Sequence, residues 1–419
     1  MLGSVTALFR RIGQGIGRLI GLFIAWLTWP FMAAHGWYGK RHWVIKAPII
    51  VIVAIILVAY GRFVWQTQTW NGFDPNFVDK YHWQDRKVPA GQQLTADPNA
   101  TPPAAGDLPT GQTEGGVNAP NTALAGSAQS GAGTSGTAQT GAASANAPRQ
   151  CQTSAIVQAA ADLTDMNVNQ NDWISSLVLY KLGLFGMDWD NTPFLDNKAS
   201  FQRGVNQAVR RTSTELVDTL GRVRGTSAIN NNLQDARGNL QFDEYSWYFG
   251  LDPFGFKTPT PSYYRTAIQK LRAFNTDLAG CNAIFDSRAD NLVQFIDRIA
   301  NDLGATAAIL RERTENHGGG WFDTRADDRF WFAYGQLYGY YAVLSGAGSD
   351  FSQVIRERNL TQLWGETLNR LRAALKMQPT IVSNAAEDGM VMPSHLAVMG
   401  FHILMVRSNL VEVRSVVGR

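Results

Sequence analysis

The sequence is short of cysteine throughout, of acidic residues at its start, and of aromatic residues in one long internal stretch. Only two of the 419 residues are cysteine, so at most one intrachain disulfide can form. Six Lys and Arg residues precede Ala47, with no Asp or Glu among them. Because the whole chain carries +3, the remainder carries −3, and a slightly acidic remainder argues against a nucleic acid partner.

One apolar run organises the chain. Residues 43–65 are bounded by two tryptophans, and residues 47–61 carry no charge and are mostly Ile, Val, Leu and Ala. As a helix, this run would span ~34 Å, which is enough for a hydrocarbon core of ~30 Å. Lys46 and Arg62 can extend their charged ends to the two interfaces. Because the run is apolar on all faces, we predict a transmembrane helix rather than a buried soluble helix.

The distribution of basic residues predicts the orientation of this helix. Basic residues are retained on the cytoplasmic side of a membrane, so the N-terminus should lie in the cytoplasm and the C-terminal part should be exported. In a bacterium this means the inner membrane with a periplasmic domain. That compartment is oxidising and permits a disulfide between Cys151 and Cys281, although the sequence does not show whether they come within reach.

The N-terminal segment, residues 1–42, holds a second apolar stretch at residues 19–34. It is ~24 Å long as a helix and is interrupted by a proline, so an interfacial helix is favoured over a second membrane span. Upstream, glycines recur at four-residue spacing, a pattern typical of close helix packing in membranes. Self-association through these glycines is therefore one hypothesis for their role: Gly13, Gly17 and Gly21.

Two segments of contrasting composition follow the membrane helix. Residues 66–87 are polar and aromatic and form a juxtamembrane segment. Residues 88–150 are almost entirely Ala, Gly, Thr, Ser, Asn, Gln and Pro, and they hold no aromatic residue. Such a stretch cannot bury enough apolar surface to offset the entropy of ordering it, so we predict a disordered linker. With a mean span of ~45 Å, it would serve as a tether that lets the distal domain reach away from the membrane.

Residues 151–419 regain helical periodicity. Apolar residues recur at three- and four-residue spacing in several stretches, and the last run, 393–417, is typical of one long helix beginning at a proline. No convincing strand alternation is present. We predict an all-α bundle of seven or eight helices outside the membrane. Two segments break the pattern: the proline-rich, aromatic stretch 226–262 and the stretch 317–329.

The segment 317–329 holds the residues most suited to chemistry. The string His317-Gly318-Gly319-Gly320 is similar to the oxyanion-hole string of lipases, but the chain has no Gly-x-Ser-x-Gly turn. Its oxygen-rich side chains could hold Ca²⁺, or a His–Asp pair could hold Zn²⁺, yet the spacing matches no known site, so no metal or other cofactor is predicted. The alternative is that these residues cap helices and form ion pairs. The candidate functional residues are His317, Trp321, Asp323, Arg325, Asp327, Asp328 and Arg329.

A second hypothesis concerns the tyrosines. Most of the aromatic helix around residues 330–341 should be core, but tyrosine hydroxyls need partners when buried, so some could line a groove for a glycan, lipid or peptide. The candidate groove residues are Tyr245, Trp247, Tyr248, Tyr334 and Tyr338.

Several long motifs together resemble a known family. They are YKLGLFG (180–186), WDNTPFLDNKASFQRGV (189–205), ELVDTLGRVRG (215–225), DEYSWYFGLDPFGFKTPTPS (243–262) and RADNL (288–292). The chain resembles a proteobacterial inner-membrane family known as domain of unknown function 2333, across the membrane helix and the C-terminal domain. The resemblance implies a membrane-anchored envelope protein, but no reaction and no catalytic residues.

The sequence favours a non-enzymatic envelope protein of unknown molecular function, a scaffold or partner-binding module. The alternative is an envelope enzyme acting on peptidoglycan or lipid, with a site near residues 226–262 and 317–329. An enzyme should show titratable groups with perturbed pKa values converging in one cleft, whereas a binding module should expose an apolar or aromatic patch.

Overall fold

The structure is a computed structural model. It describes Trp29 and residues 37–38, 41–94, 149–184, 186–192, 194–222, 229–251, 254–318, 323–385 and 392–419. The chain divides into two compact units, Met1–Thr69 and Trp70–Arg419. Apart from Trp29, the apolar stretch predicted at 19–34 lies outside the described residues, and so do the three glycines proposed for self-association.

The first unit contains α2 (Trp43–Gln68), a single helix of 26 residues. It is long and apolar enough to cross a membrane. This agrees with the predicted transmembrane helix, which α2 extends by three residues at its C-terminal end.

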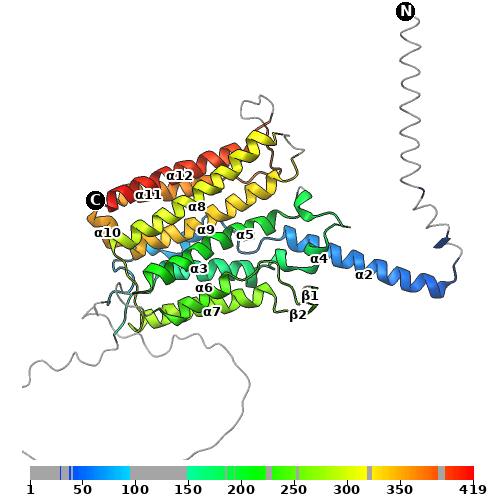
Figure 1. The fold of residues 1–419 in the computed structure, drawn as a ribbon, viewed down its shortest axis with the longest axis horizontal. Helices are drawn as coiled ribbons and strands as arrows, with labels where there is room; N and C mark the ends of the chain where they lie inside the picture. The colour runs from blue at the N-terminus through cyan, green and yellow to red at the C-terminus, as the bar shows by residue number, and fades with distance from the viewer. Residues whose placement is uncertain are drawn as a thin grey trace, which may run out of the picture. The chain divides into compact units, whose positions relative to one another are not determined.

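The second unit is a bundle of α-helices, as predicted (Figure 1). The long helices run side by side, with α8, α9, α11 and α12 on one side of the bundle and α3, α5, α6 and α7 on the other. Eight of its described helices have ten or more residues: α3 (Ala155–Asp165), α5 (Asn197–Glu215), α6 (Asn231–Leu240), α7 (Thr260–Ala279), α8 (Ala289–Asn316), α9 (Ala326–Asp350), α11 (Thr361–Leu375) and α12 (His395–Val417). Two short helices complete it, α4 (Val178–Leu182) and α10 (Ser352–Glu357).

The last helix starts two residues later than predicted. Ser394 is its N-cap, and the Ser394 side chain accepts a hydrogen bond from the backbone N–H of Ala397. Helix α12 is also long and apolar enough to cross a membrane, but it packs on α8, α9 and α11.

Helix α9 is the centre of the bundle. Twenty of its 25 residues are buried, including Phe330, Tyr334 and Tyr338. A helix that is apolar on every side must be surrounded by other helices, and α3, α5, α8, α11 and α12 all contact it. The predicted aromatic core of residues 330–341 is therefore confirmed.

Glycines allow α5 and α9 to approach each other closely. A Cβ added at Gly204 would lie 2.0 Å from the backbone oxygen of Phe332, and one at Gly335 would lie 2.1 Å from that of Phe201. Any larger residue at either position would force the two backbones apart.

The juxtamembrane residues pack along the bundle as part of the second unit. Phe77 stacks on Tyr338 of α9 with ring centroids 4.4 Å apart, and Trp83 donates its indole N–H to Gln158 of α3. Phe77 and Trp83 are both buried. We call residues 70–94 the strap. This packing differs from the separate juxtamembrane segment predicted at 66–87, because it depends on helices far away in the sequence.

The two ends of the predicted linker meet at one place. Leu94 donates its backbone N–H to Gln150 over 2.8 Å, and Gln93 pairs with Cys151 in an antiparallel bridge. Residues 95–148 lie outside the described residues, but they leave and re-enter the bundle at the same point. They therefore cannot set the distance between the bundle and the membrane, and the tether interpretation is wrong.

The structure contains a disulfide that the sequence neither predicted nor excluded. Cys151 and Cys281 are bonded, with their Cα atoms 5.3 Å apart. The bond joins the returning chain to the end of α7, where the backbone N–H of Cys151 also donates to Ala279.

The irregular stretch predicted at 226–262 contains regular elements. Residues Asn231–Leu240 form α6, and the antiparallel strands β1 (Phe249–Leu251) and β2 (Phe254–Phe256) form a short hairpin. Neither element is predicted from the sequence. Helix α6 has few apolar residues, and three-residue strands are too short to show alternation.

Candidate functional site

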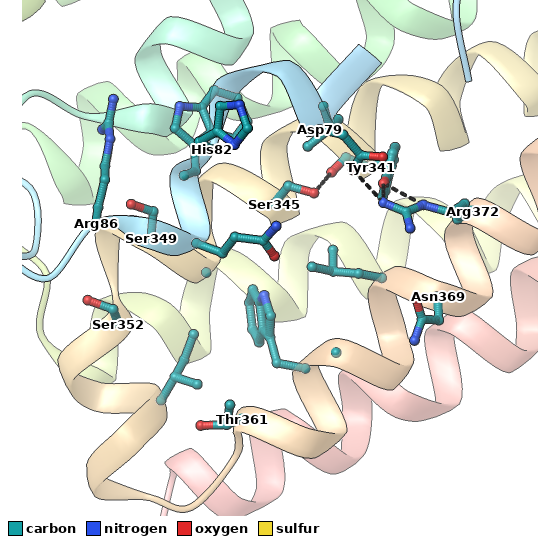
Figure 2. Close-up of a pocket in the computed structure, with 18 of the residues that line it drawn as sticks. Asp79, His82, Arg86, Tyr341, Ser345, Ser349, Ser352, Thr361, Asn369 and Arg372 are labelled. Atoms are coloured by element: carbon teal, nitrogen blue, oxygen red, sulfur yellow. Dashed lines mark hydrogen bonds and ion pairs between the residues drawn. The ribbon is translucent and has the colours of Figure 1, made fainter. Parts of the chain in front are cut away.

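A cavity lies between the strap and the helices α9, α10 and α11. It has a volume of about 760 Å³, within the usual range for ligand sites. The strap contributes the short 3₁₀ turns Phe77–Tyr81 and Trp83–Asp85 to one wall. We call this cavity the α9–α11 cleft (Figure 2).

The charge of the cleft is mostly positive. Its lining includes three arginines, Arg86, Arg356 and Arg372, and a single carboxylate, Asp79. Arg372 is paired with Asp79 and also donates to the hydroxyl of Tyr341, as Figure 2 shows. The guanidinium of Arg356 is exposed and has no partner among the described residues. The cleft therefore favours a ligand that carries negative charge.

Burial affects Arg86 in particular. Its guanidinium donates to the backbone oxygen of Thr153 over 3.1 Å and to the side-chain oxygen of Gln158 over 3.4 Å. Burial lowers the pKa of Arg86, and the carboxylate of Asp350 opposes that shift. Because Arg86 is half-buried, its guanidinium attracts an anion more strongly than a fully exposed guanidinium would.

Three polar groups in the cleft lack hydrogen-bond partners among the described residues. They are the hydroxyls of Ser349 and Ser352 and the indole N–H of Trp364. All three side chains belong to residues that are less than a tenth exposed. A buried donor or acceptor without a partner costs about 1–3 kcal/mol. The three atoms are themselves covered in this structure, so a ligand in the cleft would supply their partners after the lining side chains shift.

Neighbouring residues show how the cleft is shaped. Ser345 lies one turn before Ser349 on α9, but its hydroxyl is satisfied by the backbone oxygen of Tyr341 over 2.6 Å (Figure 2). Gly348 leaves room for the indole, since a Cβ there would lie 2.7 Å from the indole nitrogen of Trp364.

The residues predicted as a functional loop separate into two groups. Asp323 binds Arg313 at the end of α8 and accepts from Asn384 over 2.8 Å. Burial alone would raise the pKa of Asp323, but the hydrogen bonds from Arg313 and Asn384 hold it below its usual range. His317 is the exposed C-cap of α8, and only its backbone oxygen meets Asn384.

Arg325 is the N-cap of α9, and both Arg325 and Arg329 are exposed. Trp321 lies outside the described residues. Asp327 and Asp328 lie in the first turn of α9, and Asp328 accepts a hydrogen bond from Ser200 of α5. The structure therefore does not bring the predicted loop residues together in one site.

The residues predicted to line an aromatic groove also lie in two separate places. Tyr334 and Tyr338 are fully buried, and each hydroxyl donates to a backbone oxygen, that of Leu375 and that of Asp74. Tyr245, Trp247 and Tyr248 lie elsewhere, beside the β1–β2 hairpin.

That hairpin carries the most exposed aromatic side chains of the bundle's described residues. Tyr248 is 61% exposed, Phe254 78% and Phe256 94%. An exposed aromatic patch is the feature expected of a binding module.

The two segments proposed for an enzyme site meet at Arg203 of α5. Arg203 donates to the hydroxyl of Tyr245 over 2.8 Å and lies 3.9 Å from the carboxylate of Asp328. Burial raises the pKa of Asp327 to about 8, and the charge of Asp328 adds to this shift. Burial likewise raises the pKa values of Asp196 and Asp328. However, Asp196 is completely buried, so a substrate cannot reach it in this structure.

Comparison with known proteins identifies one family. A model described as an uncharacterized protein conserved in bacteria, domain of unknown function 2333, matches residues 173–318. The resemblance drawn from the sequence motifs is thus confirmed for this stretch, which ends at the C-terminus of α8 and does not include α2. No curated protein and no solved structure matches the chain.

Proposed function

We propose that this chain is a membrane-anchored module that binds an acidic peptide segment of a partner protein in the α9–α11 cleft. Its central stretch resembles an uncharacterized bacterial family. The observation that carries the proposal is the group of unpartnered polar atoms in the cleft, on Ser349, Ser352 and Trp364.

The chemistry of these groups fits a peptide. A peptide backbone offers carbonyl oxygens for the indole N–H and for hydroxyl donors, and N–H groups for hydroxyl acceptors. Acidic side chains would pair with the arginines, of which Arg356 has no partner among the described residues. The aromatic and aliphatic groups of the lining supply apolar contact.

The length and apolar composition of α2 and the basic residues before it support the location that we propose. The N-terminus lies in the cytoplasm, α2 crosses the bacterial inner membrane, and the bundle lies in the periplasm, where the Cys151–Cys281 disulfide is stable. A phosphatase fused after Arg419 should be active, because this reporter folds only outside the cytoplasm. An inactive fusion, with a cytoplasmic reporter active at the same position, would reverse the orientation.

Binding can be tested with the full chain in detergent. A fluorescent Glu/Ala peptide should bind, and the matching Lys/Ala peptide should not. Binding should weaken as salt is raised, because the arginines of the cleft are partly exposed. Trp364→Phe removes the indole N–H and keeps an aromatic ring, and we expect it to lower the affinity about tenfold, as the loss of one good hydrogen bond predicts.

A matched pair of arginines provides the control. Arg356→Ala should weaken binding of the acidic peptide, whereas Arg358→Ala should not, since Arg358 lies two residues further along the chain and does not line the cleft. Equal binding of both peptides, or equal effects of the two arginine variants, would rule out the cleft as the binding site.

The enzyme alternative has one supporting observation, the raised pKa values around Asp328. It predicts hydrolysis of peptidoglycan or lipid that Asp328→Asn abolishes. The complete burial of Asp196 and the pairing of Asp323 with Arg313 make us prefer the binding function.

A further inference from the structure

Three carboxylates lie close together near the beginnings of α5 and α9. Asp190 lies in the 3₁₀ turn Trp189–Asn191, Asp196 is the N-cap residue of α5, and Asp328 lies in the first turn of α9. One oxygen from each lies within 4.8 Å of the others. This group is separate from the residues that line the α9–α11 cleft.

Asp196 is the unusual member of the group. It is completely buried, and neither of its carboxylate oxygens has a hydrogen-bond partner among the described residues. Although it stands at the N-cap position, its side chain does not cap α5. A carboxylate without donors in a dry interior is strongly unfavourable, so something must compensate it.

The other two carboxylates are already oriented by donors. Asp190 accepts from the hydroxyl of Tyr180 over 3.0 Å, and Asp328 accepts from the hydroxyl of Ser200 over 2.6 Å. Arg203 is the nearby cation, but it lies 3.9 Å from Asp328. Asp327, next to Asp328, is also buried, so the carboxylates here outnumber the single guanidinium, and a bound cation would offset the excess negative charge.

We propose that Asp190, Asp196 and Asp328 bind a divalent cation of the calcium type. Calcium takes oxygen ligands at about 2.3–2.6 Å, so two ligands of one ion lie at most about 4.6–5.2 Å apart, and the ligand atoms of this group all lie within 4.8 Å of one another. Magnesium, with ligands at about 2.0–2.1 Å, requires a tighter arrangement. The ion would join the Trp189–Asn191 turn to the starts of α5 and α9.

The competing explanation is that protons neutralise the group. Protonated Asp196 could donate to Asp328, and the two carboxyls would then need no ion. The two explanations differ in what they predict for added metal, so the experiment must measure binding directly.

Terbium luminescence provides that measurement on the full chain in detergent. Tb³⁺ replaces Ca²⁺ at oxygen sites and is sensitised by a nearby tryptophan, here Trp189 next to Asp190. After chelator treatment, Tb³⁺ should give saturable luminescence, and Ca²⁺ should displace it at a concentration at least tenfold lower than Mg²⁺.

Variants connect the signal to the site. Asp196→Asn and Asp190→Asn should each lower the affinity for Tb³⁺ and Ca²⁺ at least tenfold. Asp188→Asn should leave it unchanged, because Asp188 is exposed and is not one of the three ligands. Asp190 is only half-buried, so its variant serves if Asp196→Asn fails to fold.

The proposal would be overturned if the wild type gave no Ca²⁺-displaceable luminescence, which would leave protons as the compensating charge. It would also be overturned if Asp196→Asn and Asp190→Asn, both folded by circular dichroism, bound Tb³⁺ as tightly as the wild type. Because these ligands lie outside the cleft, peptide binding and metal binding can each fail alone.

Discussion

Removing the Cys151–Cys281 disulfide should destabilise the bundle substantially. The bond closes a loop with a sequence separation of 130 residues. In the chain-entropy model, a crosslink over such a loop disfavours the unfolded state by about 5 kcal/mol, near the upper end of measured values. For a unit of this size, that loss corresponds to a fall of about 10 °C in melting temperature. The perturbation is the double variant Cys151→Ser with Cys281→Ser, which leaves no unpaired thiol.

The assay is urea unfolding of the full chain in detergent, followed by tryptophan fluorescence. The urea midpoint of the wild type should fall when a reductant is added, and that of the double variant should be low and insensitive to reductant. A second variant, Cys151→Ser with Cys281→Gly, should recover about 1 kcal/mol, because Cys281 has a φ of 59° that glycine adopts more readily. A midpoint unchanged by reduction, in wild type shown to be oxidised beforehand, would refute the reasoning.

Three further predictions concern stability, each measured by urea unfolding. Gly335→Ala should lower the free energy of unfolding by about 3 kcal/mol, because the added Cβ forces α5 and α9 apart. The control Gly238→Ala has open space around it and should raise the free energy of unfolding by up to about 1 kcal/mol. Equal effects of the two variants would contradict the close approach of the helices. Ser349→Ala should gain about 1 kcal/mol by removing an unpartnered hydroxyl, whereas Ser345→Ala should not, since that hydroxyl is bonded. Burial raises the pKa of Asp350 from 3.8 to about 6, so on raising the pH the unfolded chain releases this proton before the folded chain does. The stability that the protonated carboxyl contributes is therefore full below pH ~4 and is lost as the pH rises through about 6. Asp350→Asn should flatten this decline, and an unchanged pH profile would exclude Asp350 as its cause.

The helices of the bundle were predictable where local periodicity reflects the final packing. Helices α7, α8 and α11 each have an apolar stripe that faces the core, and α9 is apolar on all sides. The strap was not predicted, because its packing depends on helices far away in the sequence. A signal was nevertheless present: Trp70, Phe73, Phe77 and Tyr81 recur at three- and four-residue spacing.

The candidate site was harder to predict than the fold. The sequence predicted a site in segment 317–329 because chemically suitable residues cluster there, but Asp323 forms an ion pair with Arg313. The cleft, in contrast, is lined by common serines and arginines from segments more than 250 residues apart. Its distinguishing property is that some of those groups lack partners, and this can be recognised only once the neighbours of each atom are known. The same applies to Asp196, an ordinary N-cap residue in the sequence.

The position of the strap also determines what a cut in the chain would do. Residues 95–148 separate the strap from the remainder of the bundle, and the disulfide joins two residues that both follow them. A protease acting within 95–148 would therefore leave two pieces with no covalent bond between them: the membrane anchor with the strap, and the bundle from residue 149 onward. The strap's buried aromatic side chains would hold the pieces together, since each is worth about 1.5–3 kcal/mol. Release of the bundle from the membrane would then be limited by the rate at which the strap peels away, so the nicked protein would be shed slowly rather than at once.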